Sequence, residues 1–240
     1  MNVSINNPIL QSVSIQNTQM SSLRKMSLFA GIFYLITFVS IPTVALYGSI
    51  HQPGYITGTN SDTPAIIGGI LEIIVALAGI STSVVLYPIL RKQHQAAALG
   101  LVAARILESG TIFVGVAFLL SIVTLHQAEA GANALATSSA LVVLYDRIFL
   151  LGQSFMPAIC DLLLGFMLYK YRLVPKGLAM IGMVGALPLI AGYVAIMFGV
   201  IERNSPMAGL SAVLVALFEF SLGIYLVVKG FKPSAITADV

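Results

Sequence analysis

The sequence predicts an all-α membrane protein, a single bundle of six transmembrane helices with both termini in the cytoplasm. Three observations predict this fold. Of the 240 residues, 58% are hydrophobic and only 9% are charged, apolar runs long enough to cross a bilayer recur along the chain, and basic residues gather in alternate connections between these runs. A soluble domain carries about 25% charged residues because its whole surface meets water. A chain this poor in charge therefore requires a surface that faces lipid.

Six apolar segments have the length that a transmembrane helix needs, about 20 residues. Residues 1–23 are rich in Ser, Asn and Gln and lack the pattern of a signal peptide. We therefore expect a disordered cytoplasmic tail there, with an ordered amphipathic segment as the alternative. The transmembrane domain is expected at 24–232, followed by a short cytoplasmic tail at 233–240. The six predicted spans are residues 27–47, 65–90, 97–125, 139–169, 178–201 and 208–228.

Basic residues set the predicted orientation, because Lys and Arg accumulate in the cytoplasmic connections of membrane proteins. Most of the 12 basic residues lie before the first span, after the sixth, or in the connections that follow the second and fourth spans. These residues are Arg24, Lys25, Arg91, Lys92, Lys170, Arg172, Lys176, Lys229 and Lys232. The opposite connections contain only Arg203. We therefore expect both termini inside the cell.

Three prolines fall well inside the predicted spans, at Pro42, Pro157 and Pro188. Each removes a backbone donor and tends to kink a helix. Two interpretations stay open: the prolines give the bundle a static shape, or they mark hinges or broken helices around a binding site.

Ionisable residues inside the predicted spans are the main candidates for a functional site. These residues are Glu72, Arg105, Glu108, Asp146, Arg147, Asp161 and Glu219. A charge at the bilayer centre costs about 2.5–3.5 kcal/mol on insertion scales, so we expect these side chains to face each other or water. Arg105 and Glu108 are three residues apart on one helix and can form an ion pair. Glu108 and Glu219 both lie near the middle of their spans.

The carboxylates in this set outnumber the arginines by five to two. If each arginine pairs with one acid, three acids remain that must be protonated, solvated in a cavity, or neutralised by a cation or a ligand. Asp146, Gln153 and Asp161 share one face of the fourth span, which predicts a polar interior. Three explanations stay open: the acids only hold the helices together, they bind a small molecule or ion, or they take part in catalysis.

Several other classes of function lack support in the sequence. A net charge of +3 is too small to indicate nucleic-acid binding, and the single cysteine, Cys160, cannot form a disulfide framework or a thiolate metal cluster within the chain. The chain contains no nucleophile elbow, HExxH motif or Walker loop. Asp146 and Asp161 lie about 22 Å apart along one helix, too far to share a proton as in an aspartyl protease.

Histidines and acids in the predicted outer connections could in principle bind a divalent metal, since His51, Asp62, His126 and Glu129 all lie there. Nothing in their spacing favours a metal site over ordinary solvated side chains. We therefore predict no metal and no cofactor, and we assign no catalytic residue.

Three stretches of the sequence carry a family resemblance: LYPIL at 86–90, ARILE at 104–108 and LYKYRLVPKGL at 168–178. The last is the most distinctive, because hydrophobicity alone does not set its basic and proline positions. Over residues 24–230 the chain resembles a bacterial integral-membrane family of unknown function, the domain-of-unknown-function 4386 family. The resemblance implies a multi-pass protein of the bacterial cytoplasmic (inner) membrane, and it implies no reaction.

We favour a non-enzymatic protein that binds or moves a small polar solute, a proton or a cation at the buried charges. Arg105 and Glu108 would form the centre of the site, and the other five ionisable residues would line it. One alternative is an accessory or scaffold subunit that pairs with another membrane protein or with a second copy of itself. Another is an enzyme that acts on a lipid, with a buried Asp or Glu as general acid–base.

Overall fold

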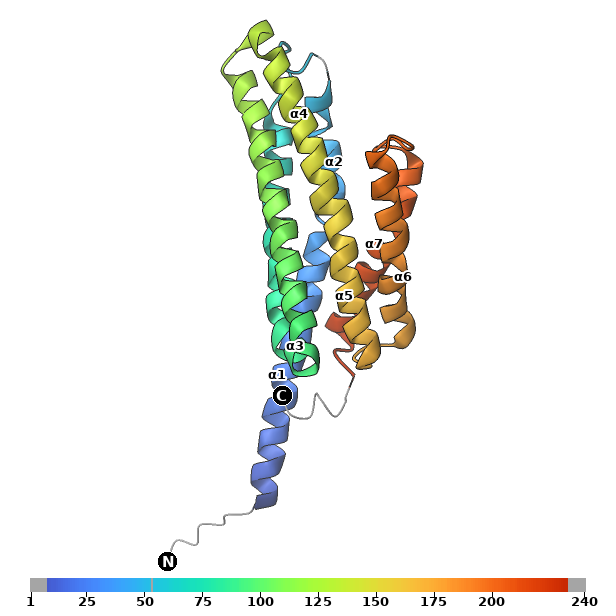
Figure 1. Cartoon of the computed structure of the whole chain (residues 1–240). Helices are drawn as coiled ribbons and strands as arrows, with labels where there is room; N and C mark the ends of the chain where they lie inside the picture. The colour runs from blue at the N-terminus through green and yellow to red at the C-terminus, as the bar shows by residue number, and fades with distance from the viewer. Residues whose placement is uncertain (1–7, 53, 233–240) are drawn as a thin grey trace, which may run out of the picture.

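The computed structural model describes residues 8–52 and 54–232, and all regular structure in these ranges is helical (Figure 1). The main helices are α1 (Pro8–Thr37), α2 (Ser40–Leu46), α3 (Thr63–Gln127), α4 (Leu135–Leu150), α5 (Met156–Lys170), α6 (Lys176–Met197) and α7 (Pro206–Val228). A π-helical turn, Leu151–Phe155, joins α4 to α5, and short 3-10 turns lie at Gly48–His51 and Gly131–Ala134. The predicted all-α class is confirmed.

Several helices of the described chain can cross a membrane. Four helical segments there are long and apolar enough, namely Thr63–Gln127, Gly131–Lys170, Lys176–Met197 and Pro206–Val228. Large apolar side chains on these segments point outward, among them Leu107 (61% exposed), Leu187 (64%) and Leu210 (66%). A continuous apolar surface of this kind is unfavourable in water. Helix length, composition and surface together indicate a multi-pass membrane protein in contact with a lipid bilayer.

Helix α3 consists of two limbs that pack against each other. Its 65 residues are interrupted at His94, whose φ of −155° and ψ of 91° are not helical. The Ser109 hydroxyl, on the second limb, donates to the backbone oxygen of Ala76 on the first limb at 2.8 Å. Nδ1 of His94 accepts a hydrogen bond of 3.2 Å from the backbone N–H of Ala97 and so caps the second limb. The second and third predicted spans fall one in each limb.

The structure interrupts two of the predicted spans close to their prolines. In the first span, α1 ends at Thr37 and α2 begins at Ser40, so the helix breaks shortly before Pro42. In the fourth span, Pro157 lies in the first turn of α5, directly after the π-helical turn. Pro188, by contrast, lies inside the continuous helix α6. Two of the three prolines therefore accompany a change of helix geometry.

Helix α1 also extends beyond the predicted span toward the N-terminus. It begins at Pro8, so residues 8–23, which we expected as a disordered tail, are helical. After Pro8 no proline or glycine occurs before Gly31, and this lets the helix continue. The rest of the two predicted tails, residues 1–7 and 233–240, lies outside the described residues.

Small residues let α7 approach its neighbours closely. A Cβ atom added to Gly31 on α1 would lie 2.7 Å from the backbone oxygen of Gly223 on α7. A Cβ atom added to Gly185 on α6 would lie 2.8 Å from Cβ of Leu214 on α7. Such contacts, made where side chains are absent, are typical of helices packed in membranes. They bring α7, which carries Glu219, against the rest of the bundle.

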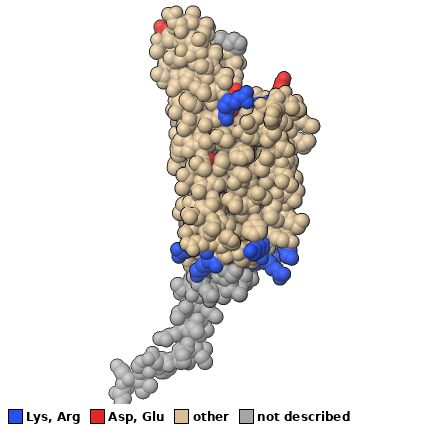
Figure 2. Space-filling model, in the orientation of Figure 1, with Lys and Arg blue, Asp and Glu red and all other residues tan. Residues whose placement is uncertain are grey.

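The basic residues that set the predicted orientation lie at one end of the bundle. All nine of them are exposed. Figure 2 shows Lys and Arg side chains gathered at the lower end of the bundle, and above them a broad band almost free of charged atoms. Such a distribution is typical of a membrane protein with one basic face.

Candidate functional site

Arg105 lies at the centre of a buried polar cluster. Its side chain is 2% exposed, and Nη1 donates to both carboxylate oxygens of Glu108 at 2.9 Å. Nη2 donates to Oε1 of Glu219 at 2.8 Å and to the Tyr34 hydroxyl at 3.3 Å. The Tyr34 ring also lies 5.5 Å from the guanidinium carbon. One guanidinium therefore joins α1, α3 and α7 through charge-assisted hydrogen bonds.

A third acid, Asp161 on α5, is fully buried beside this cluster. Its Oδ1 atom lies 4.0 Å from Nη2 of Arg105, and neither carboxyl oxygen has a hydrogen-bond partner among the described residues. The thiol of the neighbouring Cys160 donates to Oε2 of Glu108 at 3.3 Å. Three carboxyl groups thus surround a single guanidinium. We call Arg105, Glu108, Asp161 and Glu219 the Arg105 cluster.

Glu72, on the first limb of α3, forms a second polar cluster, and no Lys or Arg of the described chain pairs with it. The Thr43 hydroxyl lies 2.9 Å from its Oε1 atom, and the Tyr47 hydroxyl donates to the same atom at 3.2 Å. The amide of Gln153, in the π-helical turn, donates to Oε2. Glu72 is 2% exposed. Neutral groups alone therefore meet its carboxyl group.

Asp146 and Arg147 lie on α4 near the end of the bundle opposite the basic residues, and they belong to neither cluster. Asp146 pairs with Arg203 and lies 2.9 Å from Nε2 of His51. Burial and the charge of Arg203 lower the pKa of His51, so a neutral ring makes this contact at neutral pH. Arg147 is exposed and does not line the interior as we expected. Adjacent residues on a helix point about 100° apart, and here Asp146 contacts Arg203 while Arg147 is exposed.

The comparison with known families bears on both clusters. A family model described as Domain of unknown function (DUF4386) matches residues 29–230, which is most of the chain. The chain belongs to the DUF4386 family. No curated protein and no solved structure matches it. The predicted resemblance is confirmed, and the matched region of this DUF4386 protein contains the Arg105 cluster and Glu72.

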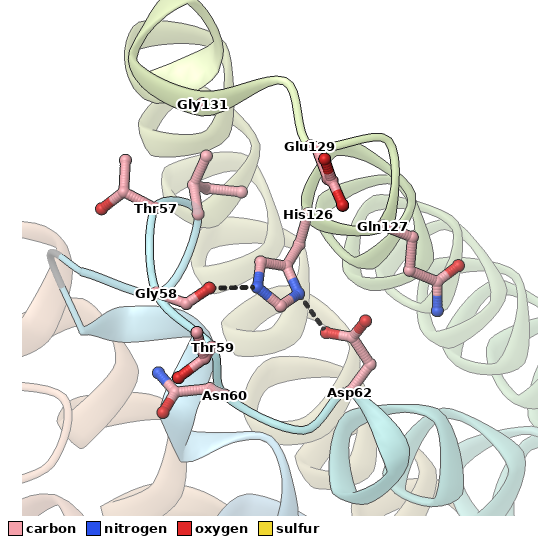
Figure 3. A pocket seen from close by; sticks show the side chains of 10 residues that line it. Thr57, Gly58, Thr59, Asn60, Asp62, His126, Gln127, Glu129 and Gly131 are labelled. Atoms are coloured by element: carbon pink, nitrogen blue, oxygen red, sulfur yellow. Dashed lines mark hydrogen bonds and ion pairs between the residues drawn. The ribbon is translucent and has the colours of Figure 1, made fainter.

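The DUF4386 chain also has a polar pocket of about 490 Å³ at the end of the bundle opposite the basic residues (Figure 3). His126 lies between two acceptors there. Its Nδ1 atom is 2.7 Å from Oδ1 of Asp62, and its Nε2 atom is 3.0 Å from the backbone oxygen of Gly58. The Tyr55 hydroxyl donates to the same Asp62 oxygen at 2.5 Å. The ring can make both hydrogen bonds only when both of its nitrogens carry a proton.

The pKa values of His126 and Asp62 shift in the directions that favour this pair. The hydrogen bond to Gly58 raises the pKa of His126, and Asp62 raises it further, while burial opposes the shift. Burial alone would raise the pKa of Asp62, but hydrogen bonds from Tyr55 and His126 outweigh it and lower the pKa. The pair fastens residues 54–62 to the end of α3.

Within the described ranges, no group of three or more His, Cys, Asp or Glu side chains is placed to hold a metal ion.

Sequence reasoning found the acids but missed most of their partners. Tyr34 and Tyr47 are hydroxyl side chains in apolar segments, where such residues are too common to indicate a site. Arg203 was placed in a connection, and no pattern linked it to Asp146. One partner could have been found from the sequence. Gln153 is an amide on the polar face of the fourth predicted span, and in the structure it contacts Glu72.

Proposed function

We propose that this protein crosses the bacterial cytoplasmic membrane six times, with both termini in the cytoplasm, and that it binds or moves a small polar solute or an ion at the Arg105 cluster. The spans would be α1 with α2, the two limbs of α3, α4 with α5, α6 and α7. The break at His94 supports this count, because it divides a 65-residue helix that is far longer than one crossing needs. The exposed basic end supports the orientation.

The observation that carries the proposal is the excess of acid around Arg105. One positive charge can balance one carboxylate, yet Glu108, Glu219 and Asp161 all lie within 4.0 Å of this guanidinium. Unbalanced charge is strongly unfavourable in an apolar interior. Protons or a bound cation must therefore neutralise the remaining acids. A buried site that takes up charge in this way can couple proton binding to the binding of a solute.

Both carboxyl oxygens of Asp161 are free to accept hydrogen bonds within the Arg105 cluster, since neither has a partner among the described residues. A buried polar atom without a partner costs about 1–3 kcal/mol, and both Asp161 oxygens and Nε of Arg105 lack one among the described residues. A group bound between these two side chains would recover part of that free energy. We therefore expect the ligand or proton to interact with Asp161 as well as with Glu108.

Charge movement by reconstituted protein tests this function. Proteoliposomes on a supported membrane would receive steps in proton, Na⁺ and K⁺ concentration, and then steps in neutral and charged amino acids. We expect a transient current from the native protein and its loss in Glu108→Gln at a similar folded yield. Glu202→Gln is the matched control, because Glu202 is exposed between α6 and α7. Equal currents from the native protein and Glu108→Gln, or none with any of these probes, would contradict the proposal.

A structural role is the second candidate, and one observation favours it. Arg105 already connects α1, α3 and α7 through hydrogen bonds of 2.8 to 3.3 Å. For a scaffold subunit, both Arg105→Leu and Glu108→Gln would lower the folded yield in detergent, and no charge movement would be seen in the native protein. If Glu108→Gln folds in detergent with the native yield but gives no current, the result favours the binding or transport function over the structural role.

A further inference from the structure

A small void lies beside Glu72, between α3 and the junction of α4 with α5. Its volume of about 10 Å³ is close to the space that a single water-sized particle needs. Glu72, Thr111, Gly115, Tyr145 and Gln153 line it together with four apolar side chains. Oxygen-bearing groups from different helices therefore surround room for one small ligand.

The carboxyl group of Glu72 is arranged as an acceptor. Tyr47 donates to Oε1 and Gln153 donates to Oε2, so both oxygens receive hydrogen bonds, which favours the ionised carboxylate. Burial opposes that form unless a positive charge is near. No Lys or Arg of the described chain pairs with Glu72. An ionised carboxylate here would need a positive charge from outside the protein.

Tyr145 is an independent sign of a ligand site. It is 2% exposed and lines the void, and its hydroxyl, which lies near that of Tyr47, makes no hydrogen bond of normal geometry to the described residues. The Thr111 hydroxyl donates its hydrogen to the backbone oxygen of Glu108 at 2.6 Å, which leaves its lone pairs available. The side-chain nitrogen of Gln153 donates to Glu72, so the side-chain oxygen of Gln153 is left as an acceptor. These oxygens could complete a shell around a cation next to Glu72.

The local backbone explains why these groups meet. Pro157 has no N–H to donate to the backbone oxygen of Gln153, so the α-helical pattern cannot continue there, and the π-helical turn Leu151–Phe155 results. Opposite it, the break between α1 and α2 precedes the segment that carries Tyr47. Interrupted helices of this kind form the ion sites of many membrane transporters.

We propose that this void binds one small monovalent cation of the size of Na⁺, held by Glu72 and by oxygen atoms of Tyr145, Thr111 and Gln153. Oxygen ligands suit hard cations. A single carboxylate with a single positive charge makes a neutral site, whereas a divalent ion would leave excess charge in an apolar interior. The void has room for one ion without its water shell. The site shares no charged residue with the Arg105 cluster and does not rest on the function proposed there.

Thermal unfolding of the purified full chain in detergent tests the site. NaCl would replace choline chloride at constant ionic strength, because a ligand that binds the folded state raises Tm with its concentration. We expect a saturable rise with Na⁺ and no response in Glu72→Gln. Tyr145→Phe should lower the apparent affinity for Na⁺ about tenfold, since it removes one ligand oxygen.

Two further variants make the test specific. Gly115→Ala adds a methyl group at the lining of the void, 3.3 Å from Cγ2 of Ile148, and should remove the Na⁺ response without removing any ligand. Glu202→Gln should keep the native response. If Glu72→Gln does not fold, Gly115→Ala and Tyr145→Phe decide the question. A native Tm that is the same in Na⁺ and choline, or that rises only with added acid, would overturn the proposal.

Discussion

Glu108 and Glu72 are buried acids on the two limbs of α3, and different partners hold them. Glu108 accepts two hydrogen bonds of 2.9 Å from the guanidinium of Arg105, whereas hydroxyl and amide groups hold Glu72. An arginine keeps its charge at any accessible pH, so charge is fixed beside Glu108. Beside Glu72 the only way to balance charge is a proton or a cation from outside. Removing the positive charge beside the first acid should therefore cost more stability than removing a neutral donor beside the second.

The largest expected effect comes from removing the fixed charge. Arg105→Leu would leave Glu108, Glu219 and Asp161 buried without a positive charge, and breaking a buried ion pair costs about 3–5 kcal/mol. We expect a large fall in Tm in detergent. Arg105→Lys should restore part of it, because an ammonium keeps the charge but not the planar geometry. A Tm for Arg105→Leu near that of the native protein would remove the difference between the two acids.

A smaller loss is expected on the Glu72 side. Tyr47→Phe removes one neutral donor to Oε1 and should cost about 1–3 kcal/mol, the range for leaving a buried acceptor short of a partner. Tyr145→Phe, measured without Na⁺, is the matched control, because that hydroxyl makes no hydrogen bond of normal geometry to the described residues. We expect Tm to fall in the first variant and not in the second. Equal losses would mean that the Tyr145 hydroxyl also contributes to stability.

The two acids also show what the sequence could and could not predict. Hydrophobic runs reveal helices, and a spacing of three residues reveals the pairing of Arg105 with Glu108, because both depend on local geometry. The contact of Glu219 with Arg105 depends on how α7 packs, and no local pattern contains that information. The π-helical turn that positions Gln153 was likewise hidden, although Pro157 gave a signal that some interruption lies there. The excess of acids over arginines in the predicted spans indicated that some acids lack an arginine partner. The prediction gathered all of these acids in one site, whereas the structure divides them between the Arg105 cluster, Glu72 and Asp146.

The outer pocket contains a third kind of acid, which is partly buried and paired with a titratable base. The raised pKa of His126 means that its contribution to stability is fully present below the ordinary value of 6.5 and is lost as pH rises through the folded value. The lowered pKa of Asp62 means that its contribution is present above the ordinary value of 3.8 and is lost as pH falls through the folded value. Tyr55 and Glu129 are the other titratable groups at this pocket.

We therefore expect residues 54–62 to be held most firmly from about pH 4 to about pH 6.5, and to loosen at higher pH. The effect should be about 1 kcal/mol or less, because water reaches the pair. Hydrogen exchange of these residues between pH 6 and pH 8.5, corrected for the intrinsic rate, would measure it. His126→Gln should remove the pH dependence above pH 6. A pH dependence that persists in this variant would assign it to another group.

Arg147 gives the smallest expected effect and the sharpest contrast with Arg105. Both are arginines inside predicted spans, but Arg105 is 2% exposed while Arg147 is exposed on α4, beside a pocket of about 590 Å³ that Phe118 and Tyr193 also line. Arg147→Gln should change stability by less than about 0.5 kcal/mol, as do most surface substitutions. The check is Tm in detergent beside that of Arg105→Leu. Similar losses in the two variants would mean that Arg147 has an interior partner in solution, and would favour a single site containing all seven predicted residues. A large difference would show that burial beside several acids, rather than position in an apolar segment, makes an arginine essential to this bundle.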